Sequence, residues 1–491
     1  LGTDRLTKRL AVTARSANFL LLLLALPLSA CGPSVNRYAL IEESLRAGDV
    51  QRADAIVESA QSQYNNASQV LYRMDRGMTL HLAGRYEDST AVLEKADQEV
   101  EQLYTRRIST DVKAMLYNDS VLPYEGATYE QVMLNIIKAL NYALAGRLSE
   151  ALVEARRVDH RLNVLSDQAG EKPDTYRDDA FARYLSGVLF EAAGELNDAF
   201  IAYRKAFAAY GGAQAGARTP TPLTLRTDLL RITDALRLTE EHDRYRQSFP
   251  NLRWQPDAEA ATRAQIVIVG YHGRAPYKQD QLIDLPISKE ALTLVLLNKT
   301  AGKPNSQEAR VDERTLVGLS GQIVRVALPQ LILQKTRVAY DQISVVGQDQ
   351  AVTSKTELAQ DVSALAAREF SEQFTSIAVR AVARVALKYA LAEGVKLGAQ
   401  AAAGRDAGPL VGLIVGGLAK AMANATEVAD TRSWRTLPDE IKIARLWVPV
   451  GTYEVRIQPM GQHGGQIGRE VVKTVTLRSG ETTFITDRVM E

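Results

Sequence analysis

The stretch Leu144-Ala-Gly146-Arg-Leu148 decides how the first half of the chain folds. It joins two segments whose Leu- and Ala-rich composition favours helix, and its glycine marks a tight turn between them. The same kind of turn recurs as Leu45-Arg-Ala-Gly48-Asp-Val50, Leu82-Ala-Gly84-Arg-Tyr86 and Ala193-Gly194-Glu-Leu196. The sequence therefore predicts a series of helix pairs over residues 38–255, in a chain of the α+β class that is mainly α.

Small residues follow each of the four glycines at matching offsets, in the second helix of each pair. This arrangement resembles the tetratricopeptide repeat, in which small residues let two antiparallel helices pack closely. The glycine spacings of 36, 62 and 48 are not constant, so residues 118–129 and 166–178 are expected to loop out. Residues 222–250 are expected to close the solenoid with a further helix pair, and a generic helical bundle is the alternative. The small residues are Ala53 and Ala60, Ser89 and Ala96, Ala151 and Val158, and Ala199 and Ala206.

The first thirty residues carry the three regions of a secretory signal in the expected order. Basic residues precede an apolar run from Phe19 to Leu28, which is shorter than the roughly 20 residues that a transmembrane helix needs. Leu28-Ser29-Ala30-Cys31 resembles a lipobox, and Cys31 is the only cysteine, so it cannot form a disulfide within the chain. We expect residues 1–30 to be a lipoprotein signal peptide and residues 31–37 a lipidated tether, with acyl chains such as palmitate on Cys31. A chance cysteine behind an ordinary signal is the alternative.

Two further features bear on location and partners. Gly32 stands where an aspartate commonly signals inner-membrane retention, which favours the outer membrane, and the first residue is Leu1, so a fragment or an alternative start is expected. Removing residues 1–30 takes four basic residues and Asp4 from totals of 59 and 58, which leaves 55 Lys and Arg against 57 Asp and Glu. A net charge of −2 argues against a nucleic-acid partner, which usually selects a strongly basic face.

The sequence changes character near residue 255, where helix-forming composition gives way to strands and turns. The run Ala264-Gln-Ile-Val-Ile-Val-Gly-Tyr271 predicts the first strand of a small β domain over residues 264–355. The final stretch predicts a C-terminal β-sandwich over residues 431–491. It is similar to carbohydrate-associated surface modules that share the strand Pro449-Val-Gly-Thr-Tyr-Glu-Val455.

Residues 356–430 are expected to form a long helical hairpin between these two β units. Its first helix, over residues 356–402, carries a basic stripe of Arg380, Arg384 and Lys388, which is either a solvated face or a docking surface for an acidic partner or lipid headgroups. A turn over residues 403–409 would place two glycine pairs opposite each other. A membrane hairpin is the alternative, although the apolar run over residues 410–418 is well under a bilayer span. The predicted helix-packing residues are Gly394, Gly398, Gly412 and Gly416.

Three motifs together resemble a family of proteobacterial outer-membrane lipoproteins with tetratricopeptide repeats. They are Gly273-x-x-Pro276-x-Lys278, the basic stripe, and above all Glu427-Val-Ala-Asp-Thr-Arg-Ser-Trp-Arg-Thr-Leu-Pro438. The resemblance covers most of the mature chain and implies a lipid-anchored protein on the periplasmic face of the outer membrane. It implies no particular activity.

No catalytic constellation stands out, so the chain is predicted not to be an enzyme and to need no cofactor beyond its covalent lipid. The five histidines fall on separate predicted elements without metal-ligand spacing, and neither a nucleophile elbow nor a phosphate-binding loop is present. Asp430, Arg432 and Trp434 form the densest polar and aromatic cluster. They could line a sugar site, but we favour an ion pair and a Trp plug that lock the hairpin onto the last β-sandwich.

The concave face of a tetratricopeptide solenoid is lined by the first helix of each pair. Aligning the turns predicts an apolar, Met-rich groove that would hold an amphipathic helix of an envelope protein. The alternative is that the insert over residues 118–129 fills it. Two functions follow, a scaffold or adaptor that binds envelope proteins through the groove, or a subunit of a self-associating outer-membrane assembly that uses the hairpin. The predicted groove residues are Met74, Met78, His81, Met133, Ile136 and Tyr184.

Overall fold

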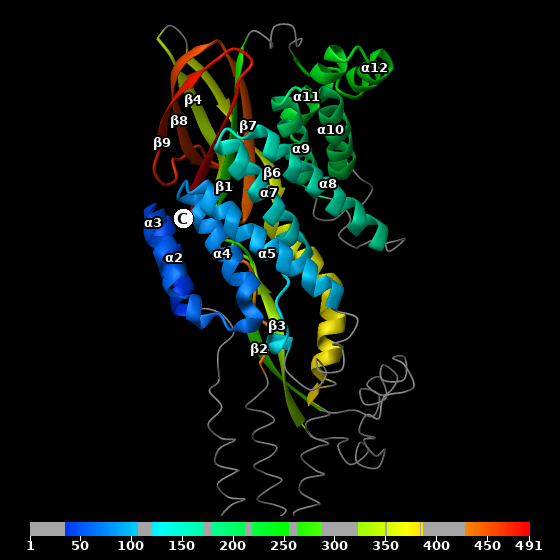
Figure 1. Ribbon diagram of the computed structural model, residues 1–491, viewed down its shortest axis with the longest axis vertical. Helices are drawn as coiled ribbons and strands as arrows, with labels where there is room; N and C mark the ends of the chain where they lie inside the picture. Colours follow the sequence, from blue (N-terminus) through cyan, green and yellow to red (C-terminus); the bar gives the residue numbers. More distant parts are fainter. Residues whose placement is uncertain are drawn as a thin grey trace, which may run out of the picture.

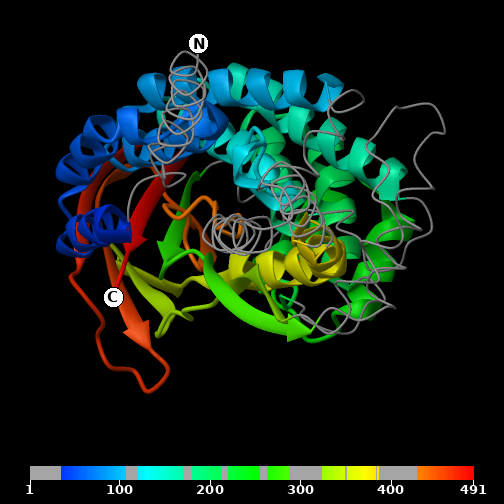
Figure 2. The same cartoon turned by 90° about the horizontal axis from the view of Figure 1, so that it is seen from below.

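The computed structural model describes residues 35–106, 119–169, 179–211, 219–254, 263–286, 323–348, 351–382, 384–385 and 428–491. A mainly helical N-terminal half is followed by β-sheets, which confirms the α+β class. Figure 2 shows the helices as an arc around the strands, so the two halves share one body. The predicted signal peptide, Cys31, Lys388 and the four hairpin glycines lie outside the described residues.

Helix pairs form the solenoid, and in the described part of the chain four of their turns lie at the predicted glycines. These glycines have φ between +73° and +80°, a left-handed conformation that residues with a Cβ rarely adopt. The turn of the closing pair uses Arg237 instead, with φ of 56°. The pairs are α2 (Val35–Ala47) with α3 (Val50–Ser59), α4 (Gln69–Leu82) with α5 (Tyr86–Arg106), α7 (Thr128–Leu144) with α8 (Leu148–Ala169), α9 (Ala180–Ala192) with α10 (Leu196–Gly211), and α11 (Leu223–Ala235) with α12 (Thr239–Ser248).

Glycines inside two first helices explain how closely their partner helices approach. A Cβ built on Gly77 of α4 would lie 2.3 Å from Leu93 of α5, and one on Gly187 of α9 would lie 2.4 Å from the Tyr203 ring of α10. Both distances are far below van der Waals contact, so a side chain at either position would force the neighbouring side chain to move. The small residues predicted in the second helices, such as Ala96 and Ala199, are buried.

The strands of the described residues form three sheets. The first has the order β10-β1-β7-β6, in which β1 pairs with β10 in parallel and with β7 antiparallel. The second has the order β5-β4-β8-β9, and β2 and β3 form a separate antiparallel ribbon. The strands are β1 (Ala264–His272), β2 (Tyr277–Pro286), β3 (Ile323–Ile332), β4 (Val338–Val346), β5 (Ala351–Lys355), β6 (Glu357–Asp361), β7 (Glu440–Val448), β8 (Gly451–Gly461), β9 (Val471–Leu477) and β10 (Thr482–Val489).

Strand β1 lies at the centre of the molecule and is buried along its whole length. Its side chains alternate between two cores. Ile266 and Ile268 belong to the core between the two four-stranded sheets, whereas Val267, Val269 and Tyr271 belong to the core shared with the helices. The first sheet is therefore sandwiched between the second sheet and the solenoid (Figure 1).

This arrangement corrects three predicted boundaries. Residues 264–355 and 431–491 are not separate β units, because strands from both segments pair within each four-stranded sheet. The hairpin helix does not begin at residue 356, because residues 357–361 pair with β7 as strand β6 and the helix starts at residue 362. The tether predicted over residues 31–37 is shorter than expected, because α2 already begins at Val35.

Candidate functional site

The six residues predicted to line an open groove are all buried. Each of Met74, Met78, Met133 and Tyr184 has 0% of its surface exposed, and His81 and Ile136 have 1%. They lie on α4, α7 and α9, the first helices of their pairs, as expected. The six residues therefore lie on the concave face of the solenoid, as predicted, but other parts of the protein cover that face.

The protein's own strands cover this concave face. His81 of α4 lies between Asn141 of α7, with its Nδ1 2.6 Å from Asn141 Oδ1, and Tyr271 of β1, with its Nε2 3.1 Å from the Tyr271 hydroxyl. Burial lowers the pKa of His81 to about 4, so its ring is neutral at physiological pH. The prediction of an open groove is thus wrong, because Val267, Val269 and Tyr271 of the sheet fill the apolar face.

A buried group of charges ties the sheet to the last repeats. Arg445 of β7 donates hydrogen bonds to Glu191 Oε2 of α9 at 3.0 Å, to the Tyr203 hydroxyl at 2.9 Å and to Asp228 Oδ2 of α11. Arg231 of α11 pairs with Glu191 Oε1 at 2.5 Å and with Asp228 Oδ1 at 3.2 Å. We call Arg445, Arg231, Glu191 and Asp228 the interface network. Its two cations balance its two carboxylates, which is what buried charges require.

The interface network also keeps Glu191 ionised. Burial alone would raise the pKa of Glu191, but the guanidinium groups of Arg231 and Arg445 outweigh it and lower that pKa to about 2. The four side chains are no more than 6% exposed. Sequence reasoning missed this network, and its signal was a charged residue, Arg445, between the apolar residues Ala444 and Leu446 of β7.

A further buried carboxylate joins the first two helix pairs to the segment before β7, residues 428–439, which we call the connecting segment. Asp75 of α4 accepts hydrogen bonds from the hydroxyls of Tyr38 at 2.8 Å, Tyr64 at 2.9 Å and Thr436 at 3.0 Å. Burial raises the pKa of Asp75 to about 6 despite these donors. Each hydroxyl comes from a different part of the fold, so Asp75 holds those parts together.

The predicted Asp430–Arg432–Trp434 cluster lies within the connecting segment. Arg432 pairs with Asp430 at 2.6 Å and donates hydrogen bonds to the backbone oxygens of Ala67, Leu122 and Asp119 at 2.9–3.1 Å. Trp434 is buried, and its ring donates to Thr436. The pair and the plug are present, but they lock the segment onto the solenoid and not onto the C-terminal strands, because Arg432 satisfies loop carbonyls between the helices.

The described residues bring His272 of β1 beside a carboxylate of β4. His272 Nε2 lies 2.9 Å from Asp341 Oδ1, but both side chains are enclosed, with at most 1% exposed. The described residues hold no group of three His, Cys, Asp or Glu side chains arranged to bind a metal. Within the same residues, each helix is too short or too polar to cross a bilayer.

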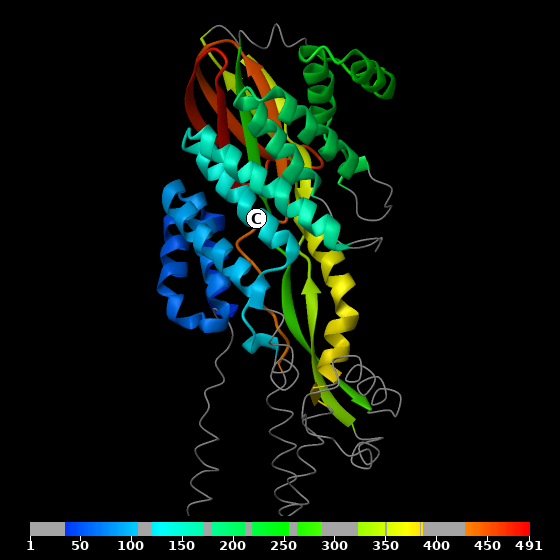
Figure 3. The same ribbon diagram turned by 45° about the vertical axis from the view of Figure 1, so that its right-hand side comes forward.

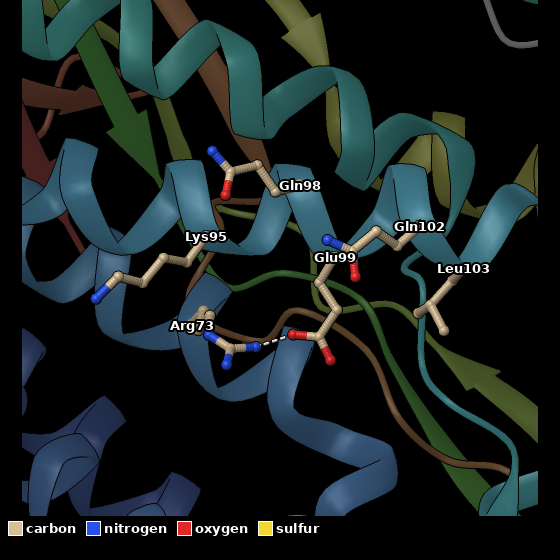
Figure 4. A pocket seen from close by; sticks show the side chains of 6 residues that line it. All are labelled: Arg73, Lys95, Gln98, Glu99, Gln102 and Leu103. Carbon is tan, nitrogen blue, oxygen red and sulfur yellow. Dashed lines mark hydrogen bonds and ion pairs between the residues drawn. The ribbon is translucent and has the colours of Figure 1, made fainter.

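The outer face of the solenoid carries a hollow of about 300 Å³ between α4 and α5. Figure 4 shows it lined by long polar side chains, with Arg73 paired to Glu99 across it. Lys95 and Gln98 are exposed at its rim. Because the hollow presents cations, amides and a carboxylate, its chemistry matches the polar surface of a partner. Its lining residues are Arg73, Lys95, Gln98, Glu99, Gln102 and Leu103.

Two solved structures are similar to part of this chain. The crystal structure of MamA is 14% identical over 42% of this chain and 91% of that chain, with a TM-score of 0.27. The Rap conjugation gene regulator of the plasmid pLS20, in complex with the Phr* peptide, is 14% identical over 44% of this chain and 55% of that chain, also with a TM-score of 0.27. The chain therefore spans about half the length of the Rap protein. No family model and no curated protein matches the sequence.

Proposed function

We propose that the protein is a non-enzymatic scaffold of the cell envelope, whose partners bind the outer face of its solenoid. The observation that carries this proposal is the closure of the concave face by the protein's own sheet, through the interface network and the His81–Tyr271 contact. A rigid body with a filled groove presents only its outer surfaces to a partner. It needs no cofactor beyond a covalent lipid.

The hollow between α4 and α5 is the contact we propose for a partner protein. A partner there would meet the exposed donors of Lys95 and Gln98 and the Arg73–Glu99 pair. Such a surface favours a polar segment with its own carboxylates and amides over the apolar face of an amphipathic helix. The proposal therefore replaces the Met-rich groove with a polar site between α4 and α5.

A pull-down from envelope extract tests this contact. The variant Lys95→Glu with Gln98→Glu reverses the charge at the rim, and Arg246→Glu with Gln247→Glu makes matched changes on exposed positions of α12. We expect the first variant to lose a co-purifying partner that the wild type and the α12 variant keep. Equal recovery by all three proteins would contradict the proposal.

The anchor belongs to the same proposal, with Cys31 carrying lipid on the periplasmic face of the outer membrane. Cys31 lies four residues before α2, so the lipid would hold the solenoid within about 14 Å of its attachment point. Fractionation of cells tests it. We expect Cys31→Ser to leave the outer-membrane fraction, and retention at the wild-type level would contradict it. A self-associating assembly is the alternative function, and size-exclusion chromatography of the purified protein distinguishes it by a defined oligomer.

A further inference from the structure

The β2–β3 ribbon extends from one end of the fold, beside the helix that starts at residue 362. Figures 1 and 3 show both strands extending past α2 and α4, away from the end that holds β8 and β9. The strands pair without a break from Tyr277 opposite Ile332 to Pro286 opposite Ile323. Ten residues in an extended strand span about 30 Å, so the ribbon is a long arm.

At the end of this arm that carries Pro286 and Ile323, one face is packed and the other presents exposed side chains. On β3, Val324 and Val326 are buried, and they point to one face because alternate residues do so. On the other face Leu282 is 56% exposed and Ile323 is 70% exposed. They are the two most exposed large apolar side chains among the described residues, so this end of the arm offers apolar surface to a partner.

The charges on the open face cancel. Arg325 and Asp284 lie opposite each other between the two apolar positions and form a bidentate pair, with distances of 2.9 and 3.1 Å. The face therefore presents two exposed apolar side chains beside a neutral ion pair. A lipid bilayer, which has an apolar layer beneath its polar headgroups, matches that pattern better than a charged protein surface does.

The lipid anchor proposed at Cys31 would hold the protein with this arm close to a bilayer. The Arg435 guanidinium lies over the rings of both Tyr38 and Tyr277, at 4.3 and 4.5 Å, so the first turn of α2 and the start of β2 share one site. Seven residues from Cys31 to Tyr38 reach at most about 25 Å, which is less than the length of the arm. The other end of α2, at Gly48, lies beside Arg469 of the β8–β9 loop.

We propose that Leu282 and Ile323 on the open face of the β2–β3 ribbon rest in the interfacial layer of the bilayer that holds the Cys31 lipid. This inference rests on the lipid anchor proposed above. The lipid holds the protein at the membrane, and the ribbon is a second contact that fixes its orientation, with the β8–β9 end directed away from the bilayer. The Arg325–Asp284 pair brings no net charge to the headgroups, which keeps the cost of this shallow contact low.

The test attaches the chain to lipid chemically, so that it does not depend on lipidation in the cell. The chain from Cys31 onward is coupled through its only thiol to maleimide-headgroup lipids in phosphatidylcholine vesicles with brominated acyl chains. Ile323→Trp places a fluorophore on the ribbon, and Ile201→Trp is the matched control on α10, where Ile201 is 41% exposed. We expect the bromines to quench the added fluorescence of Ile323→Trp and to leave that of Ile201→Trp unchanged.

Two outcomes would overturn the proposal. Equal quenching of both variants, or of neither, means that the ribbon does not rest on the bilayer. A blue shift of Ile323→Trp that grows with protein concentration in the absence of vesicles means that a second copy covers the face instead. Failure of the anchor itself is recognised separately, because it appears in the fractionation of Cys31→Ser and not in the coupled sample.

Discussion

Replacing Arg445 with methionine probes how strongly the sheet and the solenoid depend on each other. The change removes the one cation that β7 contributes to the interface network and leaves Glu191 and Asp228 with Arg231 alone. Because these carboxylates are at most 6% exposed, water cannot replace the lost partner. Breaking a buried ion pair by removing one side costs about 3–5 kcal/mol, so we expect a loss of unfolding free energy of that size.

The pH dependence of this loss has a definite sign. The folded-state pKa of Glu191 is about 2 against an ordinary value of 4.5, so its ionised form stabilises the fold above about pH 4.5, and that contribution is lost as the pH falls toward 2. Removing Arg445 takes away part of what lowers this pKa. The difference between wild type and Arg445→Met should therefore be largest at neutral pH and shrink below about pH 4.5.

Urea unfolding followed by tryptophan fluorescence measures the effect at the interface itself. Trp447 of β7 lies 5.0 Å from the Arg231 guanidinium, so its emission reports on contact between the sheet and α11. Arg456→Met is the matched control, because Arg456 is 48% exposed and pairs with Glu454 on the surface of β8, where a pair contributes at most about 1 kcal/mol. If Arg445→Met loses no more stability than Arg456→Met, the network does not hold the two halves together.

Three further changes test other parts of the fold. Met78→Glu combined with Met133→Glu should unfold the protein and not merely release a partner, because each buried carboxylate costs several kcal/mol of folding free energy. A double variant that circular dichroism shows to be folded would refute the filled groove. Burial raises the pKa of Asp75 from 3.8 to about 6, so Asp75 stabilises the fold most below about pH 3.8 and less as the pH rises through 6. Over that range the unfolding free energy of Asp75→Asn, measured by denaturant titration, should rise relative to that of the wild type by up to about 3 kcal/mol. A difference that stays constant with pH would contradict this. Gly187→Ala should lower the unfolding free energy by about 1–3 kcal/mol, because its Cβ would meet the Tyr203 ring, whereas Gly211→Ala has open space around it and should not. Equal melting temperatures of the two variants would contradict the close-packing explanation.

Local patterns in the sequence were sufficient to predict the helix pairs. Each turn is set within a few residues, because a glycine such as Gly146 takes a positive φ and small residues such as Ala151 let the next helix pack. The strand over residues 264–271 was equally local, since a run of β-branched residues bounded by turns favours an extended chain. These parts of the prediction needed no knowledge of distant contacts.

The arrangement of the sheets could not be predicted in the same way, because it depends on distant pairings. Gln265 pairs with Thr482, and no local pattern records that β10 runs parallel to β1. A strand that is buried on both faces, such as β1, has a continuous apolar sequence. That sequence does not show that one of its faces packs against helices. The Met-rich face of α4 and α7 has the composition of a groove and of a core alike, and only the position of the sheet decides between them.

Thiol labelling of the two faces of β1 tests the filled solenoid most directly. In a Cys31→Ser background, Val269→Cys places a thiol toward the helices and Ile268→Cys places one toward the second sheet. If the solenoid packs on the sheet, both thiols should react with a soluble alkylating reagent only at the rate of global unfolding, far more slowly than Val472→Cys at an exposed position of β9. Fast labelling of Val269→Cys, with Ile268→Cys still protected, would show that the concave face is open and would contradict the account.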